Sequence, residues 1–245
     1  MSAVSALDHL SHSQIQSFLI CPRKWHYEKI EHAQKEQVSS NLIFGVAVHD
    51  ALAAVNEAAL VGDSVDVVAT FIGAWKTTIE KSGTTVHYGK DDADSLLEKG
   101  KELVKLYKAP KNIIGVEQPF TVEVDSELPP VEGRIDLIRR DDDGNLTISD
   151  LKTSGTKILS DTYAAESQLG LYNFAYPAAK HEVIVLGKLK TPTITVQPIQ
   201  AWSHDLIHQQ YREVHDAMKH GIRYANRGWQ CTGCQFYNRC QKDRS

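Results

Sequence analysis

Two acidic side chains and a lysine near the middle of the chain have the types and spacing that metal-assisted hydrolysis requires. Asp136 follows Gly133-Arg-Ile, and Asp150 is followed by Leu151-Lys152. Two carboxylates that converge on one point repel each other unless a hard divalent cation, Mg²⁺ or Mn²⁺, neutralises them. A lysine beside them can orient an attacking water or stabilise charge that develops on a phosphate. The competing interpretation is an ordinary strand whose two acids are solvated.

Two strands are expected to position these groups. The segments Val131 to Arg140 and Asn145 to Lys152 alternate apolar and polar residues, and Asp-Asp-Asp-Gly-Asn lies between them, which predicts an antiparallel hairpin. Successive side chains of a strand point to opposite faces, so Asp150 and Lys152 share one face while Leu151 faces the core. The metal interpretation requires a register that brings Asp136 beside Asp150.

Further polar side chains surround the hairpin in sequence. His49 ends Gly45-Val-Ala-Val-His49 on an alanine-rich segment, 41–60, that is expected to be helical, and Glu117 lies on a strand-like segment, 113–124. A single histidine on such a helix is more often a structural residue than a ligand. Glu117 has two interpretations, a distal ligand or general-base helper and a solvated strand residue. After the hairpin, Gln168 and Tyr172 are one turn apart on an expected helix and share one face.

The order of these motifs resembles a known family. Gly-x-x-x-His, Gly-x-x-Asp, Asp-x-Lys and Gln-x-x-x-Tyr follow one another as in the RecB-type branch of the PD-(D/E)xK nucleases, which includes the iron–sulfur nucleases associated with CRISPR adaptation. The resemblance covers nearly the whole chain, and its one departure is Ile135 in place of proline before Asp136. It implies an α/β fold with a restriction-endonuclease-like core, in which helices flank a central mixed β-sheet.

The resemblance also implies roles for individual residues. One or two Mg²⁺ or Mn²⁺ ions are expected to be held by His49, Asp136, Asp150 and the carbonyl of Leu151. Lys152 is expected to position the attacking water. Gln168 and Tyr172 are expected to border the site, where they contact the substrate or support the lysine. The expected catalytic set is therefore Asp136, Asp150, Lys152, Gln168 and Tyr172.

Four cysteines predict a second metal centre. Cys21 stands alone, and Cys231, Cys234 and Cys240 form Cys-x2-Cys-x5-Cys. Without a secretory signal, this spacing indicates metal ligation more than disulfides. Four thiolates suit either zinc or a [4Fe–4S] cluster, and the spacing does not separate them; four unliganded buried thiols are the third alternative. The resemblance favours the [4Fe–4S] cluster, acting as a staple that ties segment 228–245 to the N-terminal helix.

The rest of the chain is expected to complete one nuclease domain over residues 1–245. Two helical stretches within a helical insertion at about 60–110, Val65 to Lys81 and Asp91 to Lys108, are interpreted as a lid or as packing. Segments 183–189 and 193–202 predict a second hairpin. A long amphipathic helix is expected over His204 to Asn226.

The N-terminal helix is expected to begin near Ser13 and to break at Pro22, which lacks an amide donor. Trp25 and Tyr27 follow beside Arg23 and Lys24. Basic and aromatic side chains in this order can clamp a single DNA strand. The competing interpretation, that Trp25 and Tyr27 pack against the next helix, is the one we favour.

Composition is consistent with a cytoplasmic enzyme. No apolar run reaches the roughly 20 residues that span a bilayer, and Met1 to Asp8 lacks the basic flank and apolar core of a signal peptide. The net charge of −4 excludes a bulk polycation, so any nucleic-acid surface must be a local basic strip. Membrane association is not expected.

The sequence therefore predicts a metal-dependent DNA nuclease, an exonuclease that acts on single-stranded DNA or DNA ends. The resemblance implies a helicase or an integrase as partner. One alternative is a non-catalytic DNA-binding or scaffolding subunit of a recombination or CRISPR adaptation complex. A second alternative treats the cluster as a redox sensor that gates DNA binding.

Overall fold

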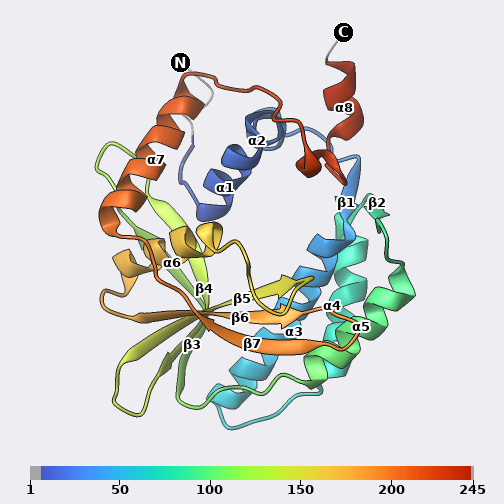
Figure 1. Cartoon of the computed structure of the whole chain (residues 1–245), viewed down its shortest axis with the longest axis vertical. Coiled ribbons are helices and arrows are strands. Elements are labelled where there is room, and N and C mark those ends of the chain that lie inside the picture. The colour runs from blue at the N-terminus through green and yellow to red at the C-terminus, as the bar shows by residue number, and fades with distance from the viewer. Residues whose placement is uncertain (1–6, 244–245) are drawn as a thin grey trace.

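A five-stranded sheet with helices on both sides forms the centre of the molecule in a computed structural model that describes residues 7–243 (Figure 1). The expectation about a signal peptide concerns Met1 to Asp8, which lies mostly outside these residues. The helices are α1 His12–Ile20, α2 Pro22–Lys29, α3 Ser40–Leu60, α4 Val67–Ser82, α5 Ala93–Lys105, α6 Tyr163–Ala175, α7 His204–Lys219 and α8 Tyr237–Lys242. The strands are β1 Gln37–Ser39, β2 Thr85–His87, β3 Ile113–Val122, β4 Val131–Arg140, β5 Leu146–Ser154, β6 Lys180–Gly187 and β7 Thr193–Pro198.

The sheet is mixed, as predicted. Its strand order is β3-β4-β5-β6-β7, and only β5 and β6 run parallel to each other. The β4–β5 hairpin is confirmed: Asp141 donates its N–H to the carbonyl of Asn145 at 2.9 Å. Gly144 has a φ of 83°, a conformation that suits glycine in such a turn. The second predicted hairpin is β6–β7.

Helices α3, α4 and α5 cover one face of the sheet (Figure 1). Phe44 of α3 packs edge-on against Phe71 and Trp75 of α4, and Leu96 and Leu103 of α5 belong to the same buried cluster. By length and composition α3 could cross a membrane. Its buried residues instead contact α4, α5 and the sheet, so it is a core helix. The two helices of the predicted insertion thus pack on α3.

The other face is covered by α1, α6 and α7. Trp25 and Tyr27 of α2 are each 1% exposed. Trp25 packs edge-on against Phe18, and Tyr27 against Phe236 near the C-terminus. These two rings are therefore packing residues, and the interpretation in which they clamp DNA is wrong.

The N-terminal helix pair differs in detail from the prediction. The N-cap of α1 is Ser11 and not Ser13, because the Ser11 hydroxyl accepts the N–H of Gln14. Helix α1 ends at Ile20, and α2 begins at Pro22, with Cys21 in extended conformation between them. Proline at the first position of a helix leaves no hydrogen bond unmade, so the predicted break falls at Cys21.

The C-terminal segment returns to this helix pair. Helix α7 ends at Lys219, earlier than the predicted Asn226, and Gly221 has a φ of 71° just beyond it. The chain then runs along the junction of α1 and α2, where the N–H of Arg23 donates to the carbonyl of Tyr224 at 3.1 Å. The side chain of Asn226 donates to the carbonyl of Ile20 at 2.9 Å. The short parallel pair β1–β2 was not anticipated.

Candidate active site and cysteine centre

The β4–β5 hairpin opens where the two aspartates lie. Pairing of the two strands ends at Leu137 and Ser149, and the same register places Asp136 opposite Asp150 just beyond that pair. On its other edge, β5 pairs with β6 from Thr147 to Ser154. The N–H of Leu151 is therefore free to turn to the carboxylate of Asp136, and it donates to Oδ2 at 2.7 Å. The opening of the strands creates the space into which both acids reach.

Asp150 and Lys152 form a buried hydrogen-bonded network with α6. Lys152 Nζ lies 2.9 Å from Asp150 Oδ2 and donates to Gln168 Oε1 at 2.8 Å. Gln168 Nε2 donates to Asp150 Oδ1 at 2.8 Å and to the hydroxyl of Tyr172 at 2.7 Å. The Tyr172 hydroxyl in turn donates to the carbonyl of Arg134 at 3.2 Å. The amide of Gln168 thus fixes the acid, the lysine and the tyrosine relative to one another.

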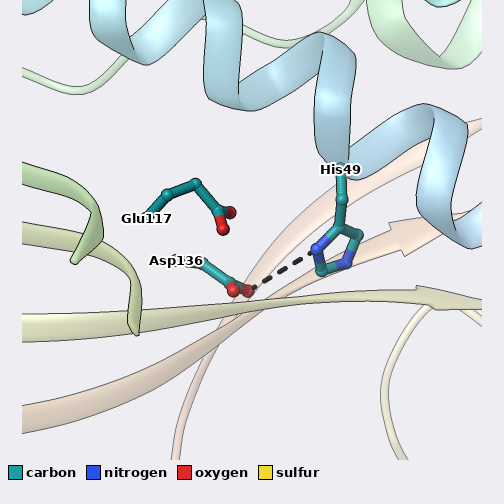
Figure 2. A group of neighbouring side chains, drawn as sticks. All are labelled: His49, Glu117 and Asp136. Atoms are coloured by element: carbon teal, nitrogen blue, oxygen red, sulfur yellow. Dashed lines mark ion pairs between the residues drawn. The ribbon is translucent and has the colours of Figure 1, made fainter. Parts of the chain in front are cut away.

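A second group of side chains faces the same opening from the opposite side. Figure 2 shows His49 on α3 pointing toward Asp136, with the Glu117 carboxylate beside them. One ligand atom from each of the three lies within 4.8 Å of the others, and His49 Nδ1 is 3.8 Å from Asp136 Oδ2. An imidazole and two carboxylates at this separation match the ligands of a hard or borderline divalent cation. The group is a candidate cation site.

Backbone strain directs Glu117 into this group. Glu117 has a φ of 47°, a left-handed conformation that is uncommon for a residue with a side chain, in the middle of β3. The side chain also lies 3.5 Å from the guanidinium of Arg134. Residues held in such conformations cost about 1–3 kcal/mol and gather at functional sites. Nothing in the sequence signals this local reversal.

Asp136 and His49 of the candidate cation site are held in their neutral forms. Burial, and then the neighbouring carboxylate of Asp150, raise the pKa of Asp136 to about 8. Burial likewise lowers the pKa of His49, although Asp150 and the Leu151 backbone oppose that shift. Both groups are consequently neutral near pH 7, and their 3.8 Å approach is not an ion pair. A bound cation would reverse this balance and draw the proton from Asp136.

Lys152, the cationic partner of Asp150, retains its charge. Burial opposes the ammonium of Lys152, but the Asp150 and Asp136 carboxylates outweigh it and raise the pKa of Lys152. Burial also raises the pKa of Glu117, against the pull of the Arg134 guanidinium. A lysine held charged beside two acids can position a water or a phosphate oxygen but is a poor base.

The residues predicted from the sequence are distributed over two subsets of one site. His49, Asp136 and the Leu151 backbone lie on the cation side, and Lys152, Gln168 and Tyr172 lie on the α6 side. Asp150 lies between them, with its carboxylate directed to Lys152 and Gln168. Glu117 joins the cation side, for which the sequence had left its role open. The roles themselves stay a prediction.

One residue near Lys152 was not anticipated at all. His12, in the first turn of α1, has its pKa lowered to about 3 by burial and by the charge of Lys152. The sequence placed it 140 positions from that lysine without any periodic or motif signal. Only the packing of α1 on α6 brings the two together.

The four cysteines also meet in space. Cys21 at the α1–α2 junction, Cys231, Cys234 and Cys240 line one cavity, and none of them forms a disulfide. Burial is the main cause that raises the pKa of the Cys234 thiol, and the neighbouring Cys21 and Cys231 raise it further. A hydrogen bond with the Phe236 backbone and the charge of Lys24 oppose the shift. Four thiols around one cavity are a donor set for a thiophilic metal centre.

Comparison with solved structures supports the fold. A crystal structure from Eubacterium rectale that carries the name "Putative exonuclease" matches at a TM-score of 0.57, with 12% sequence identity over 100% of this chain and 91% of that chain. The structure of SSO0001 covers 93% of this chain and 96% of its own, at 15% identity and a TM-score of 0.44, which is too low to carry an argument. No curated protein sequence matches the chain.

The sequence family accounts for the site. The opened hairpin, the Asp-x-Lys motif on β5 and the acidic group beside it are spread over β3, β4, β5, α3 and α6, which all fall within the span of one family model. The model of the PD-(D/E)XK nuclease superfamily matches residues 9–241. The chain belongs to the PD-(D/E)XK nuclease superfamily.

Proposed function

We propose that the chain is a Mg²⁺- or Mn²⁺-dependent deoxyribonuclease of the RecB-type branch that degrades DNA from an end. The observation that carries this proposal is the junction of two groups at the β4–β5 opening. The ligand atoms of His49, Glu117 and Asp136 lie within 4.8 Å of one another. Asp150, opposite Asp136 in the strand register, lies with its Oδ2 2.9 Å from Lys152 Nζ. A scaffold would not need this costly arrangement of buried acids.

The residues present fit a divalent cation. His49, Glu117, Asp136 and the Leu151 carbonyl would hold it, and Asp150 can join them by turning from Gln168. The cation, when bound, lowers the pKa of a water ligand and shields charge on the scissile phosphate. Lys152 positions the attacking water, while Gln168 and Tyr172 keep Lys152 and Asp150 oriented. Asp136 would give up its proton on binding the cation.

Single-stranded DNA is the substrate form that the surface favours. Segment 221–229 connects α7 to the short 3-10 turn Trp229–Cys231. It is held to the α1–α2 junction by hydrogen bonds from the Arg23 N–H to the Tyr224 carbonyl and from the Asn226 side chain to the Ile20 carbonyl. Tyr224 is 60% exposed and Trp229 is 81% exposed, and Arg223 and Arg227 alternate with them. Exposed aromatic rings stack with unpaired bases, and arginines between them contact phosphates. This segment supplies the local basic strip that a chain of net charge −4 requires.

The cysteine centre is proposed to be a [4Fe–4S] cluster held by Cys21, Cys231, Cys234 and Cys240. Its support is the cavity that the four cysteines share and the family resemblance of their spacing. The absence of disulfides among these cysteines fits a reducing, cytoplasmic setting. Residues 1–245 would then form one nuclease domain, stapled at its two ends, that a helicase or integrase partner could recruit.

The test combines both centres. Anaerobic purification, an absorption spectrum and iron and zinc assays are followed by digestion of a single-stranded oligonucleotide with Mn²⁺, with Mg²⁺ and with Ca²⁺. We expect a brown protein that cuts with Mn²⁺ or Mg²⁺ and that binds DNA without cutting it in Ca²⁺. A colourless zinc protein that cuts DNA would contradict the cluster but keep the nuclease function. A brown protein that never cuts would support the scaffolding alternative.

A further inference from the structure

A cavity of about 390 Å³ adjoins Lys152 on the side away from the candidate cation site. Its walls include Lys152 and Gln168, but none of His49, Glu117 and Asp136. The first turns of α1 and α6, the beginning of β4 and Phe120 of β3 complete it. The volume is in the range of small-ligand pockets, about 300–1,000 Å³. The site proposed for hydrolysis thus opens directly into a separate, preformed cavity.

The lining has the three kinds of surface that a nucleotide uses. Arg134, with a side chain 63% exposed, and Lys152 supply positive charge. Phe120 and Leu171 supply apolar surface, and the ring of Phe120 is held edge-on by Tyr172 at 5.5 Å. A phosphate is matched by the cations and a base by the apolar wall.

The α1 wall has hydrogen-bonding capacity that the protein leaves unused. His12 and Gln16 line the cavity, and His12 Nδ1 and Gln16 Nε2 are buried atoms without a hydrogen-bond partner. Buried polar groups are rarely left unpaired. These two atoms lie beneath the cavity surface, so a ligand can pair with them once the His12 or Gln16 side chain turns toward the cavity. His12 remains neutral because burial and Lys152 lower its pKa to about 3, which lets the imidazole pair with an uncharged base or sugar.

Helix α1 forms one wall of the cavity, which is open to solvent where it is lined by the exposed residues Ser13, Arg134 and Ala164. Behind His12 and Gln16, the side chains of Ile15 and Phe18 are 0% and 5% exposed and belong to the core cluster with α7. A DNA strand that enters from Lys152 toward α1 meets this wall and the core behind it, so the wall favours the end of a strand as the occupant.

We propose that this cavity binds the terminal nucleotide of the strand being cut, with its phosphate toward Arg134 and Lys152 and its base against Phe120 and the α1 wall. The inference rests on the proposed nuclease function and deepens it. It makes the enzyme an exonuclease that releases mononucleotides. Glu132, whose carboxylate lies at the exposed rim, is positioned to hydrogen-bond a sugar hydroxyl or a base amino group.

Ala164→Trp provides the test. Ala164 is an exposed residue at the rim of the cavity, so the indole fills the cavity without disturbing the core. Ala69→Trp, on the exposed side of α4, is the matched control. With linear single-stranded DNA and Mn²⁺, we expect the wild type and Ala69→Trp to release mononucleotides, and Ala164→Trp to raise KM by at least about tenfold. Covalently closed circular single-stranded DNA should resist all three proteins.

A second variant guards against a folding failure in the first. Gln16→Leu keeps the volume and removes the amide, and it should raise KM about threefold to tenfold with little change in kcat, as expected for one lost hydrogen bond. Unchanged KM in both variants would overturn the proposal. Cleavage of circular DNA at the linear rate would overturn it as well.

Binding separates the failure of this inference from that of the nuclease function. Calorimetry with deoxyadenosine monophosphate and Ca²⁺ should show binding to wild type and Ala69→Trp and none to Ala164→Trp. If the wild type cuts no DNA but this pattern holds, the cavity is confirmed as a nucleotide site and the nuclease function fails. If the wild type cuts DNA but binds the mononucleotide no better than Ala164→Trp does, the cavity inference fails.

Discussion

At the scale of single residues, the site holds buried acidic groups whose charges are unfavourable in the free protein and would be stabilised by a bound cation. Asp136 is buried beside Asp150, and both effects raise its pKa so that it is protonated near pH 7, although a metal ligand must be ionised. Asp150 is 1% exposed and is compensated by Lys152 and Gln168. Perturbed carboxyls gather at functional sites because the same burial that costs stability prepares the group for binding or catalysis. Two predictions follow from this balance.

The first concerns Asp150. Asp150→Asn keeps the size of the side chain and its hydrogen bond to Gln168 but removes the charge, so the fold should survive while a ligand and the partner of Lys152 are lost. We expect cleavage with Mn²⁺ to fall by at least about 10²-fold, with a circular dichroism spectrum like that of the wild type. Asp143→Asn, in the exposed turn of the same hairpin, should cut normally. A folded Asp150→Asn protein with full activity would remove Asp150 from the mechanism.

The second concerns Asp136 and pH. Its pKa is about 8 in the folded protein against an ordinary 3.8, so between these values the native state binds more protons than the unfolded state. Metal-free protein should therefore lose stability as pH rises from about 4 through 8. The apparent affinity for Mn²⁺ should rise over the same window, because the cation must displace that proton.

Thermal melts in chelator and Mn²⁺ titrations at pH 6, 7 and 8 measure both trends. Asp136→Asn should flatten the dependence of stability on pH, and Asp143→Asn should leave it unchanged. An affinity for Mn²⁺ that does not vary with pH would show that Asp136 is already ionised.

At the scale of elements, the sequence predicted most of what periodicity can reveal. The β4–β5 hairpin, the mixed sheet and the helix that carries Gln168 and Tyr172 follow from alternation and helical spacing. Their relative placement does not. The end of pairing at Leu137 and the left-handed Glu117 depend on tertiary contacts, and local patterns contain no information about them.

The same limit explains the error in the end of α7 and the open alternative for two aromatic residues. Gly221 ended α7 although the amphipathic pattern continued, since a left-handed glycine overrides propensity. Packing was the favoured interpretation of Trp25 and Tyr27, but the DNA clamp stayed open because nothing in the sequence shows that Phe18 and Phe236 cover them.

Strands β3 and β4 supply a prediction at this scale. Gly133 pairs with Phe120 across the two strands, and a Cβ on Gly133 would lie 2.6 Å from the Phe120 ring. Gly133→Ala should therefore displace the ring and destabilise the protein by about 1–3 kcal/mol. Phe120→Leu should recover part of that loss in the double variant, because the smaller side chain leaves room for the new methyl group.

Urea unfolding of the wild type, both single variants and the double variant gives the coupling energy. Additive losses in the double variant would show that the two positions do not compete for space. Ile114→Ala, at an exposed position of β3, serves as the control that should combine additively with Gly133→Ala.

At the scale of the whole molecule, the α1–α2 pair and the C-terminal segment meet and enclose the cysteine centre. Besides the backbone contacts of segment 221–229, Gln37 Nε2 donates to the Cys234 carbonyl at 3.1 Å, and the Glu36 N–H donates to the Gln235 carbonyl at 2.9 Å. The C-terminal segment and α8 have no element of the central sheet beneath them (Figure 1). Their attachment to the fold therefore depends on contacts with α2 and the segment after it. These contacts are the hydrogen bonds above, those from the Asn238 and Arg239 N–H groups to the Glu36 carboxylate, the packing of Phe236 on Tyr27, and whatever the four thiols bind.

This arrangement predicts a separation between stability and chemistry. Cys234→Ser should remove the visible absorbance of a cluster and release the C-terminal segment, while the β4–β5 opening and α6 remain intact. At this chain size a loss of about 1 kcal/mol lowers the melting temperature by about 2–4 °C, so a loss of about 2–3 kcal/mol should lower it by roughly 4–12 °C. Thr232→Ser, an exposed change between Cys231 and Cys234, should keep both colour and melting temperature.

Cleavage by Cys234→Ser should depend on the length of the substrate. Below the melting transition, a short oligonucleotide that reaches only the hairpin site should be cut by Cys234→Ser near the wild-type rate. A long single strand that also contacts Tyr224 and Trp229 should be cut with a higher KM. Equal melting temperatures and spectra for wild type and Cys234→Ser would mean that the four cysteines hold no structural group.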